Sequence, residues 1–198
     1  MMVNEISRQM KAHIDVIRMV EEQLTESIAE CARMLVDALQ NDCKILIMGN
    51  GGSAADAQHF AAEMVGRFLM ERRALPAIAL TTDTSILTAV GNDYGFDEIF
   101  TRQVEALANP GDVIIGISTS GNSPNVKRAL ESGQKIGAKT VALLGRDGGE
   151  IGPIVDFCLT IPSFETPRVQ ESHLVVIHIL CDLIEQGLFQ PDCFFKNE

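Results

Sequence analysis

From residue 43 onward, short apolar segments alternate with longer segments of helical periodicity, and this alternation constrains the fold more than any other feature. The candidate strands are short apolar runs at 44–48, 77–80, 113–117, 140–144 and 157–161. The candidate helices lie at 54–69, 84–90, 97–107, 125–136 and 168–187. Short, fully apolar strands separated by helices are typical of a parallel sheet covered on both faces. The sequence therefore predicts an α/β fold with a parallel sheet flanked by helices.

The first 40 residues carry apolar side chains at helical spacing instead. The two apolar stripes consist of Ile6, Met10, Ile14, Ile17 and Val20, and then of Ile28, Cys31, Ala32, Leu35, Val36 and Leu39. This periodicity predicts two helices, at 3–22 and 24–40, with a break near Thr25. A long amphipathic helix ahead of a sheet packs either against another subunit or on its own domain, and the pattern fits both.

Length and charge restrict the class of protein. The 198 residues suit one domain with a sizeable core. The net charge of −11 disfavours nucleic acid, whose phosphate backbone needs clustered Lys and Arg. No apolar run approaches the roughly 20 residues needed to span a bilayer, and residues 1–6 lack the basic start of a signal peptide. We expect a cytoplasmic protein with no membrane or nucleic-acid partner.

The cysteines do not indicate a disulfide framework. The five are Cys31, Cys43, Cys158, Cys181 and Cys193. Their number is odd and no two are spaced as C-x-x-C, which argues against both a disulfide framework and a thiolate zinc site. Most are expected to be small buried side chains.

Two loops follow candidate strands, and both are therefore expected at the carboxyl end of the sheet, where such sheets bind ligands. The first loop, 49–53, is glycine-rich, and Gly49, Gly51 and Ala54 satisfy a relaxed dinucleotide-binding pattern. That pattern alone is weak, and the acidic residue expected about 20 positions further on is missing, because Asp83 lies too far along. A tight loop that lets the backbone approach a smaller ligand is the better interpretation.

The second loop, 116–125, carries four hydroxyl side chains ahead of a candidate helix. Ser123 suits the N-cap of that helix and Pro124 its first position. A helix N-terminus presents unpaired N–H groups and the positive end of the dipole, and hydroxyls donate to phosphate oxygens. The loop therefore predicts a phosphorylated small molecule as ligand, with an ordinary capped turn as the alternative.

Histidine and carboxylate side chains gather on two candidate helices. His59 and Glu63 are four residues apart on one helix, and Gln170 and His178 are eight apart on the other, so each pair shares a face. The four side chains could bind one divalent metal ion or supply an acid and a base for proton transfer. A solvated ion pair and a core histidine would explain them separately. Their coincidence with the two loops favours a functional role for His59, Glu63 and His178.

Taken together, these segments resemble the SIS (sugar isomerase) domain. The matching segments are 49–53, 56–63, 91–93, 116–123 and 168–173, followed by His178. In this order, and over nearly the whole chain, the set is similar to the phosphoheptose isomerase (sedoheptulose 7-phosphate isomerase) family.

The resemblance implies a flavodoxin-like fold in which residues 1–198 form a single SIS domain. It implies a homotetramer with active sites at subunit interfaces, with residues 1–40 involved in that packing. The implied reaction converts D-sedoheptulose 7-phosphate to D-glycero-D-manno-heptose 7-phosphate through an enediol, and supplies heptose for bacterial lipopolysaccharide or capsule. Some members bind zinc, so one Zn²⁺ per subunit is expected.

The resemblance also implies individual roles. Glu63 matches the catalytic base and His178 the catalytic acid. The implied metal ligands are His59, Glu63, Gln170 and His178. The implied substrate-binding residues are Asn50, Gly51, Gly52, Ser53, Asn92, Asp93, Ser118, Thr119, Ser120, Ser123 and Gln170.

One departure from the family pattern lies just before the segment 168–173. Pro167 stands where some members have an acidic residue, which leaves the role of that acid open, with Glu165 as a substitute. Glu171 and His173, within the segment itself, are expected to have structural roles.

A non-enzymatic SIS adaptor that binds the replication initiator protein is the alternative function. The segments 181–189 and 80–83 resemble such an adaptor. Adaptors of this kind lack the glutamate and histidine that this chain has at Glu63 and His178, and the isomerase is therefore favoured. A sugar-phosphate-sensing regulator would carry a DNA-binding domain, and no helix-turn-helix or basic patch is present.

Overall fold

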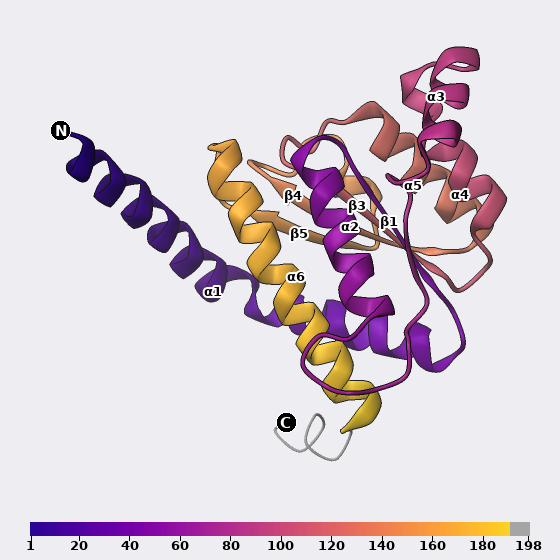
Figure 1. The fold of residues 1–198 in the computed structure, drawn as a ribbon, viewed down its shortest axis with the longest axis horizontal. Helices are drawn as coiled ribbons and strands as arrows, with labels where there is room; N and C mark the ends of the chain where they lie inside the picture. Colours follow the sequence, from indigo (N-terminus) through magenta and orange to yellow (C-terminus); the bar gives the residue numbers. More distant parts are fainter. Residues whose placement is uncertain (191–198) are drawn as a thin grey trace.

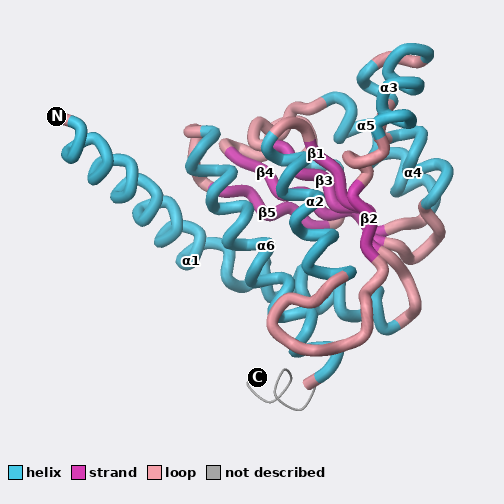
Figure 2. The backbone as a smooth tube through the Cα atoms, viewed as in Figure 1, coloured by secondary structure: helices cyan, strands magenta, loops and turns pink. Residues whose placement is uncertain are grey.

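The computed structural model describes residues 1–190, which form a parallel sheet between two layers of helices (Figures 1 and 2). The strands are β1 (Ile45–Gly49), β2 (Ala77–Ala79), β3 (Val113–Ser118), β4 (Lys139–Gly145) and β5 (Phe157–Ile161). They form a five-stranded sheet in the order β2-β1-β3-β4-β5, and every neighbouring pair is parallel. This is the flavodoxin-like order. The predicted α/β class is confirmed, and each predicted strand lies within one residue of an observed one at either end.

Alternating strand residues build two separate cores, because successive side chains point to opposite faces of a sheet. On one face Ile45 and Ile47 pack with the helices α1 (Met2–Gln40), α2 (Gly52–Val65) and α6 (Thr166–Phe189). On the other face Leu46 and Met48 pack with α4 (Thr101–Leu107) and α5 (Pro124–Ile136). The helix α3 (Thr84–Asp93) lies beside this second layer and contributes no buried residue (Figure 1).

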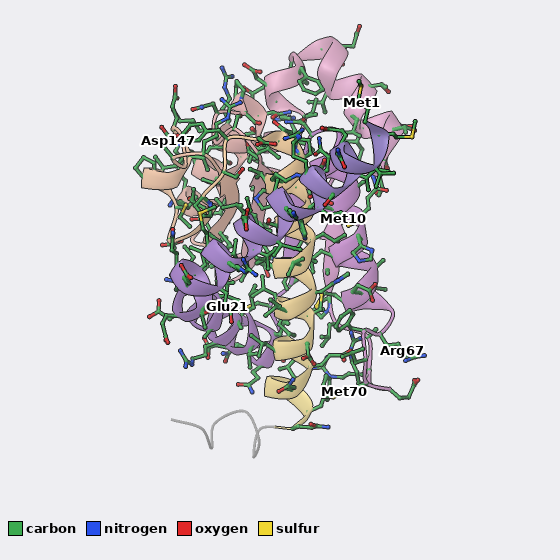
Figure 3. The ribbon with its side chains drawn as sticks, turned by 90° about the vertical axis from the view of Figure 1, so that its left-hand side faces the viewer. Met1, Met10, Glu21, Arg67, Met70 and Asp147 are labelled. Carbon is green, nitrogen blue, oxygen red and sulfur yellow. The ribbon has the colours of Figure 1, made fainter. Side chains whose placement is uncertain are left out.

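The N-terminal segment is one helix of 39 residues, so the predicted break near Thr25 is wrong. The Thr25 hydroxyl donates to the carbonyl of Glu21 at 2.5 Å, a bond that keeps the residue within the helix. The second half of α1 builds core, with Leu35 fully buried. The first half projects from the body and leaves Met10 65% exposed (Figures 1 and 3).

Two predicted helices have different bounds in the structure. The helix expected at 54–69 ends at Val65, where Arg72 donates to the last carbonyls of α2. The helix expected at 97–107 begins as a 3-10 turn, Phe96–Glu98, and α4 starts only at Thr101. Ile99 and Phe100, between the two, are both buried in the second core. A second 3-10 turn, Gly152–Ile154, precedes β5.

The helix α6 is long and apolar enough to cross a membrane by length and composition, with a mean hydropathy of 1.4. No apolar segment of this length is expected from the sequence. Half of that apolar window is buried inside the fold, where α6 packs on α1 and α2. Core helices of soluble proteins meet the same criterion, so the apolar residues of α6 are explained by the core.

The cysteines of the described residues are all free. Cys31 and Cys181 are buried and Cys43 and Cys158 are half-buried, and no disulfide forms among residues 1–190. Cys193 lies outside the described residues.

A fully buried histidine joins α6 to the sheet. His173 Nε2 donates to the Leu144 carbonyl at 2.9 Å, and His173 Nδ1 is buried without a hydrogen-bond partner. Burial lowers the pKa of His173 to about 4, against an opposing effect of the bond to Leu144. The structural role expected for this residue agrees with these contacts, because a neutral imidazole is the form that this site accommodates.

We predict that this histidine makes the protein less stable in mild acid. In the unfolded chain His173 binds a proton near pH 6.5, whereas in the folded protein it does so only near pH 4. The contribution of neutral His173 to the free energy of unfolding is therefore complete above pH 6.5 and is lost as the pH falls towards 4. The expected loss is roughly 2–3 kcal/mol, measurable by urea unfolding between about pH 7 and about pH 4.5. His173→Gln should flatten that dependence. Equal stability of the unmodified protein at both pH values would contradict the prediction.

Candidate active site

The two loops singled out in the sequence follow neighbouring strands, β1 and β3, at the point where the strand order reverses direction. Ligands of open α/β sheets bind at this switch point. The glycine loop is tight: a Cβ on Gly49 would lie 2.7 Å from the Ser53 carbonyl oxygen. Gly51, with φ of +58°, precedes α2 in a conformation that favours glycine. A Cβ on Gly51 would meet no atom within 4 Å, so the backbone is open to a ligand at this residue.

An amide pair that the sequence analysis did not find joins the two loops. Asn50 and Asn125 exchange reciprocal side-chain hydrogen bonds of 2.9 Å, and Asn125 is buried. Asn125 Oδ1 also accepts the backbone N–H of Val126 at the start of α5. Asn125 stands just after Pro124 in the hydroxyl loop, but its partner is 75 residues away. Only the fold brings the two amides together.

The hydroxyl loop gathers its serine side chains into one cluster. Ser118 Oγ lies 2.8 Å from Ser123 Oγ and 3.5 Å from Ser120 Oγ. Ser123 occupies the N-cap position of α5 as predicted, but its side chain makes no capping hydrogen bond because it turns to Ser118 instead. Gly121, with φ of +69°, packs so closely on Gly148 that a Cβ would lie 2.3 Å from the Gly148 carbonyl oxygen. These contacts hold several hydroxyl groups of the loop close together.

The predicted acid–base residues meet along the seam between α2 and α6, which lie side by side (Figures 1 and 2). His59 Nε2 and His178 Nε2 are 2.8 Å apart, and Glu63 Oε1 is 3.6 Å from His59 Nε2. In a hydrogen bond between these two nitrogens one ring donates and the other accepts, and the tautomers of the two rings decide which. The Phe68 ring packs on His178, with centroids 5.4 Å apart.

Gln170 lies at the end of the same seam where both α2 and α6 begin. Its side chain fills the space over Gly52, where a Cβ would lie 1.6 Å from Gln170 Nε2. The residue therefore contacts the glycine loop directly, and any larger side chain at position 52 would displace it. His178 follows on the same face of α6, about two turns further along.

The donor set of this seam suits a zinc ion. Zinc takes imidazole nitrogen and carboxylate oxygen as ligands, and the nitrogens of His59 and His178 already face each other beside Glu63. Among residues 1–190, no three His, Cys, Asp or Glu side chains are arranged to hold a metal ion as they stand. A neutral oxygen donor such as the Gln170 amide would complete the set.

Asp56 lies three residues before His59 on α2 and was not predicted from the sequence. One of its carboxylate oxygens is buried without a hydrogen-bond partner. Burial raises the pKa of Asp56 to about 6, and the nearby His59 opposes this shift. An acidic group with a raised pKa therefore lies on the same helix as His59 and Glu63.

Two further predicted positions lie apart from the seam. Asn92 and Asp93 are exposed at the end of α3, on the second face of the sheet, where Asn92 Nδ2 donates to Asp93 Oδ1 at 2.8 Å. Pro167 occupies the first turn of α6, and Glu165 is the exposed N-cap residue of that helix. The prediction that Glu165 replaces the missing acid remains a prediction.

Comparison with known proteins places this chain in a family. The sequence model of the SIS domain matches residues 10–145. A phosphoheptose isomerase of Geobacter sulfurreducens is 61% identical over 188 residues, which cover 95% of this chain and 100% of the relative. That of Geobacter metallireducens is 62% identical over 189 residues, which cover 96% of this chain and 100% of the relative. The chain belongs to the SIS-domain phosphoheptose isomerase family.

Solved structures agree with this membership. The phosphoheptose isomerase of Neisseria gonorrhoeae superposes with a TM-score of 0.90 at 46% identity, over 94% of this chain and 100% of that one. The phosphoheptose isomerase of Francisella tularensis superposes with a TM-score of 0.91 at 39% identity, over 94% and 99%. This member of the phosphoheptose isomerase family is thus an enzyme, an isomerase, and the predicted fold and family are confirmed.

The segments that resembled an initiator-binding adaptor have structural roles in this phosphoheptose isomerase family member. Leu80 and Cys181 are buried in the two cores. Asp83 is the N-cap of α3 and accepts the N–H of Ile86 at 2.9 Å. The fold itself accounts for these residues.

Proposed function

We propose that this enzyme converts D-sedoheptulose 7-phosphate to D-glycero-D-manno-heptose 7-phosphate, a step in bacterial heptose biosynthesis for lipopolysaccharide or capsule. The observation that carries the proposal is the meeting of Glu63, His59 and His178 beside two loops at the switch point of the sheet. The relatives named above are phosphoheptose isomerases, which supports a seven-carbon sugar phosphate as substrate.

The hydroxyl loop binds the phosphate in this proposal. Ser118 Oγ already lies within hydrogen-bond distance of Ser120 Oγ and of Ser123 Oγ, so a phosphate that displaces these contacts meets several donors at once. Thr119 and the N-terminus of α5 add a further hydroxyl and the positive end of a helix dipole. The glycine loop and its neighbours, Asn50–Ser53, contact the sugar, as do Asn92, Asp93 and Gln170.

Glu63 and His178 carry out the proton transfers. Glu63 takes the proton from C1 of the open-chain ketose, which gives a cis-enediol, and returns a proton at C2. His178 moves a proton between the oxygens on C1 and C2, so that the carbonyl forms at C1 and the hydroxyl at C2. No atom is gained or lost. A carboxylate and an imidazole suit these two roles, because both side chains act as general acids and bases in enzymes.

A zinc ion, one per subunit, is part of the proposal. His59, Glu63, Gln170 and His178 would hold it, and their nitrogen and oxygen donors fit this metal. The chemistry that zinc supplies when bound is polarisation of a carbonyl and stabilisation of the negative charge that develops on oxygen.

A cytoplasmic homotetramer with active sites at subunit interfaces completes the proposal, with residues 1–198 as a single SIS domain. The projecting half of α1 supports it, because this half exposes Ile6, Met10 and Ile14. A groove of 520 Å³ lies between this half of α1 and α6, and most of its lining is apolar side chain, including Leu174 and Val175. Residues 1–40 would then serve both the core and the assembly.

The test is to incubate the purified protein with D-sedoheptulose 7-phosphate and to follow aldose formation by NMR, with and without added zinc. Turnover is the expected result, and the comparison shows whether the metal assists. Absence of turnover under both conditions would overturn the proposed reaction. Capture of the replication initiator protein in a parallel pull-down would then establish the adaptor function instead.

A further inference from the structure

A buried ion pair lies at the end of the α2–α6 seam, outside the acid–base cluster. Arg72 Nε donates to Glu185 Oε1 at 3.0 Å, and the two side chains are only 1% and 0% exposed. Arg72 belongs to the loop between α2 and β2, and Glu185 to the last turns of α6. Figure 3 shows this loop, with Arg67 and Met70 labelled, beside the end of α6.

The Glu185 carboxylate holds the loop by its backbone. It accepts the consecutive N–H groups of Phe68, Leu69 and Met70 at 2.9, 2.9 and 2.8 Å. Burial raises the pKa of Glu185, but the backbone donors and then Arg72 outweigh burial and hold the pKa below its usual range. The carboxylate therefore stays charged at neutral pH and fixes three successive residues at once.

The Arg72 guanidinium holds the end of α2. Its Nη2 donates to the carbonyl of Glu63 at 2.7 Å, and its Nη1 donates to the carbonyls of Met64 and Gly66 at 2.8 and 2.9 Å. Helix ends leave their last carbonyls without partners in the helix, and here one side chain donates to two of them, those of Glu63 and Met64, and to the carbonyl of Gly66 just beyond. The backbone of Glu63 is therefore fixed through Arg72.

Both ends of this network lead to the acid–base pair. Arg72 fixes the backbone of Glu63, and the backbone bond from Phe68 to Glu185 places the Phe68 ring against His178, with centroids 5.4 Å apart. Glu185 lies seven residues after His178, so the two share a face of α6. We propose that Arg72 and Glu185 are positioning residues, whose ion pair fixes the position of Glu63 relative to His178 across the α2–α6 seam. This inference rests on the proposed roles of Glu63 and His178.

Stability alone is a poor explanation of the pair. Removing two charges from water is unfavourable, and well-packed apolar residues often replace a buried ion pair with no loss of stability. An apolar pair would fill the volume but would not accept three N–H groups or donate to three carbonyls at defined angles. The charged groups therefore add a fixed orientation of the backbone groups that they bind.

The experiment compares Glu185→Gln with a matched control, Asp112→Asn. Asp112 is a second buried carboxylate that binds a cation, Lys44, and two backbone N–H groups, but none of these partners belongs to α2 or α6. Each substitution removes one charge and keeps one carbonyl oxygen. The kcat, the KM and the thermal midpoint are measured for both variants and for the unmodified enzyme.

Glu185→Gln should lower kcat by about 10- to 100-fold with KM within about threefold, because displacement of reacting groups by about 1 Å has effects of this size. Asp112→Asn should lower the thermal midpoint similarly and leave kcat within about threefold. An equal effect of the two substitutions on kcat, or a Glu185→Gln effect confined to KM, would overturn the inference.

A second readout needs no turnover and so separates this inference from the proposed function. The chain has four histidines, His13, His59, His173 and His178. Their imidazole signals can be assigned in proton–nitrogen spectra by substituting each in turn. Glu185→Gln should shift the signals of His59 and His178 and leave those of His13 and His173 in place. Unchanged signals of His59 and His178 would overturn the inference even in an active enzyme.

Discussion

Glu63→Gln is expected to lower kcat by about three orders of magnitude, within the range of about 10²–10⁴ that general acid–base catalysis contributes. Glutamine has nearly the shape of glutamate but cannot take a proton from carbon. The KM should change little, because the proposed phosphate-binding hydroxyls belong to another loop. Steady-state kinetics with D-sedoheptulose 7-phosphate measure both constants.

The structure also indicates that the Glu63→Gln variant should fold. The Glu63 side chain is 23% exposed and lies 3.6 Å from His59 Nε2, so glutamine fits without burying a new polar group. Glu105→Gln is the matched control, since Glu105 is an exposed carboxylate on α4 that pairs with Arg102. It should retain full activity. A kcat of Glu63→Gln within about tenfold of the unmodified enzyme would remove Glu63 as the base.

Arg72→Met is expected to reduce the free energy of unfolding by about 3–5 kcal/mol, the range found when one partner of a buried ion pair is removed. The substitution leaves Glu185 charged and fully buried, and it removes the donor to the carbonyls at the end of α2. Urea unfolding measures the loss. Arg102→Met, which breaks an exposed pair with Glu105, should change the free energy of unfolding by less than about 1 kcal/mol.

A double variant isolates the unpaired charge as the cause. In Arg72→Met with Glu185→Gln, the neutral amide oxygen still accepts backbone N–H groups, so part of the lost stability should return. If Arg72→Met alone changed stability no more than Arg102→Met does, the ion pair would have no such importance for the fold.

How far the fold could be predicted from sequence depends on the range of the interactions. The strands were predicted closely because each is a continuous apolar run between polar turns. The break near Thr25 was wrong because a hydroxyl that often interrupts helices here bonds within one. The end of α2 was missed because it depends on Arg72, whose carboxylate partner is 113 residues away.

The residues of the candidate site could likewise be predicted only where the local sequence carries the signal. His59, Glu63 and His178 were predicted from helical spacing and from the family resemblance, and the structure brings all three together. Asn125 and Glu185 could not be predicted, because an amide and a carboxylate in their local sequences carry no sign of their distant partners. The chemical roles of the site residues remain predictions until the variants are measured.

The two parts of the unbroken helix α1 are subject to different structural constraints. Its buried apolar residues begin at Val16, and its exposed large apolar residues end at Ile14. Changes after this boundary alter the core and are constrained by folding, whereas changes before it alter the exposed surface and the contacts of Gln9 and His13 with α6. Related chains can therefore diverge in what they present to their neighbours within a single helix, while the remainder of that helix keeps the sheet and its active site unchanged.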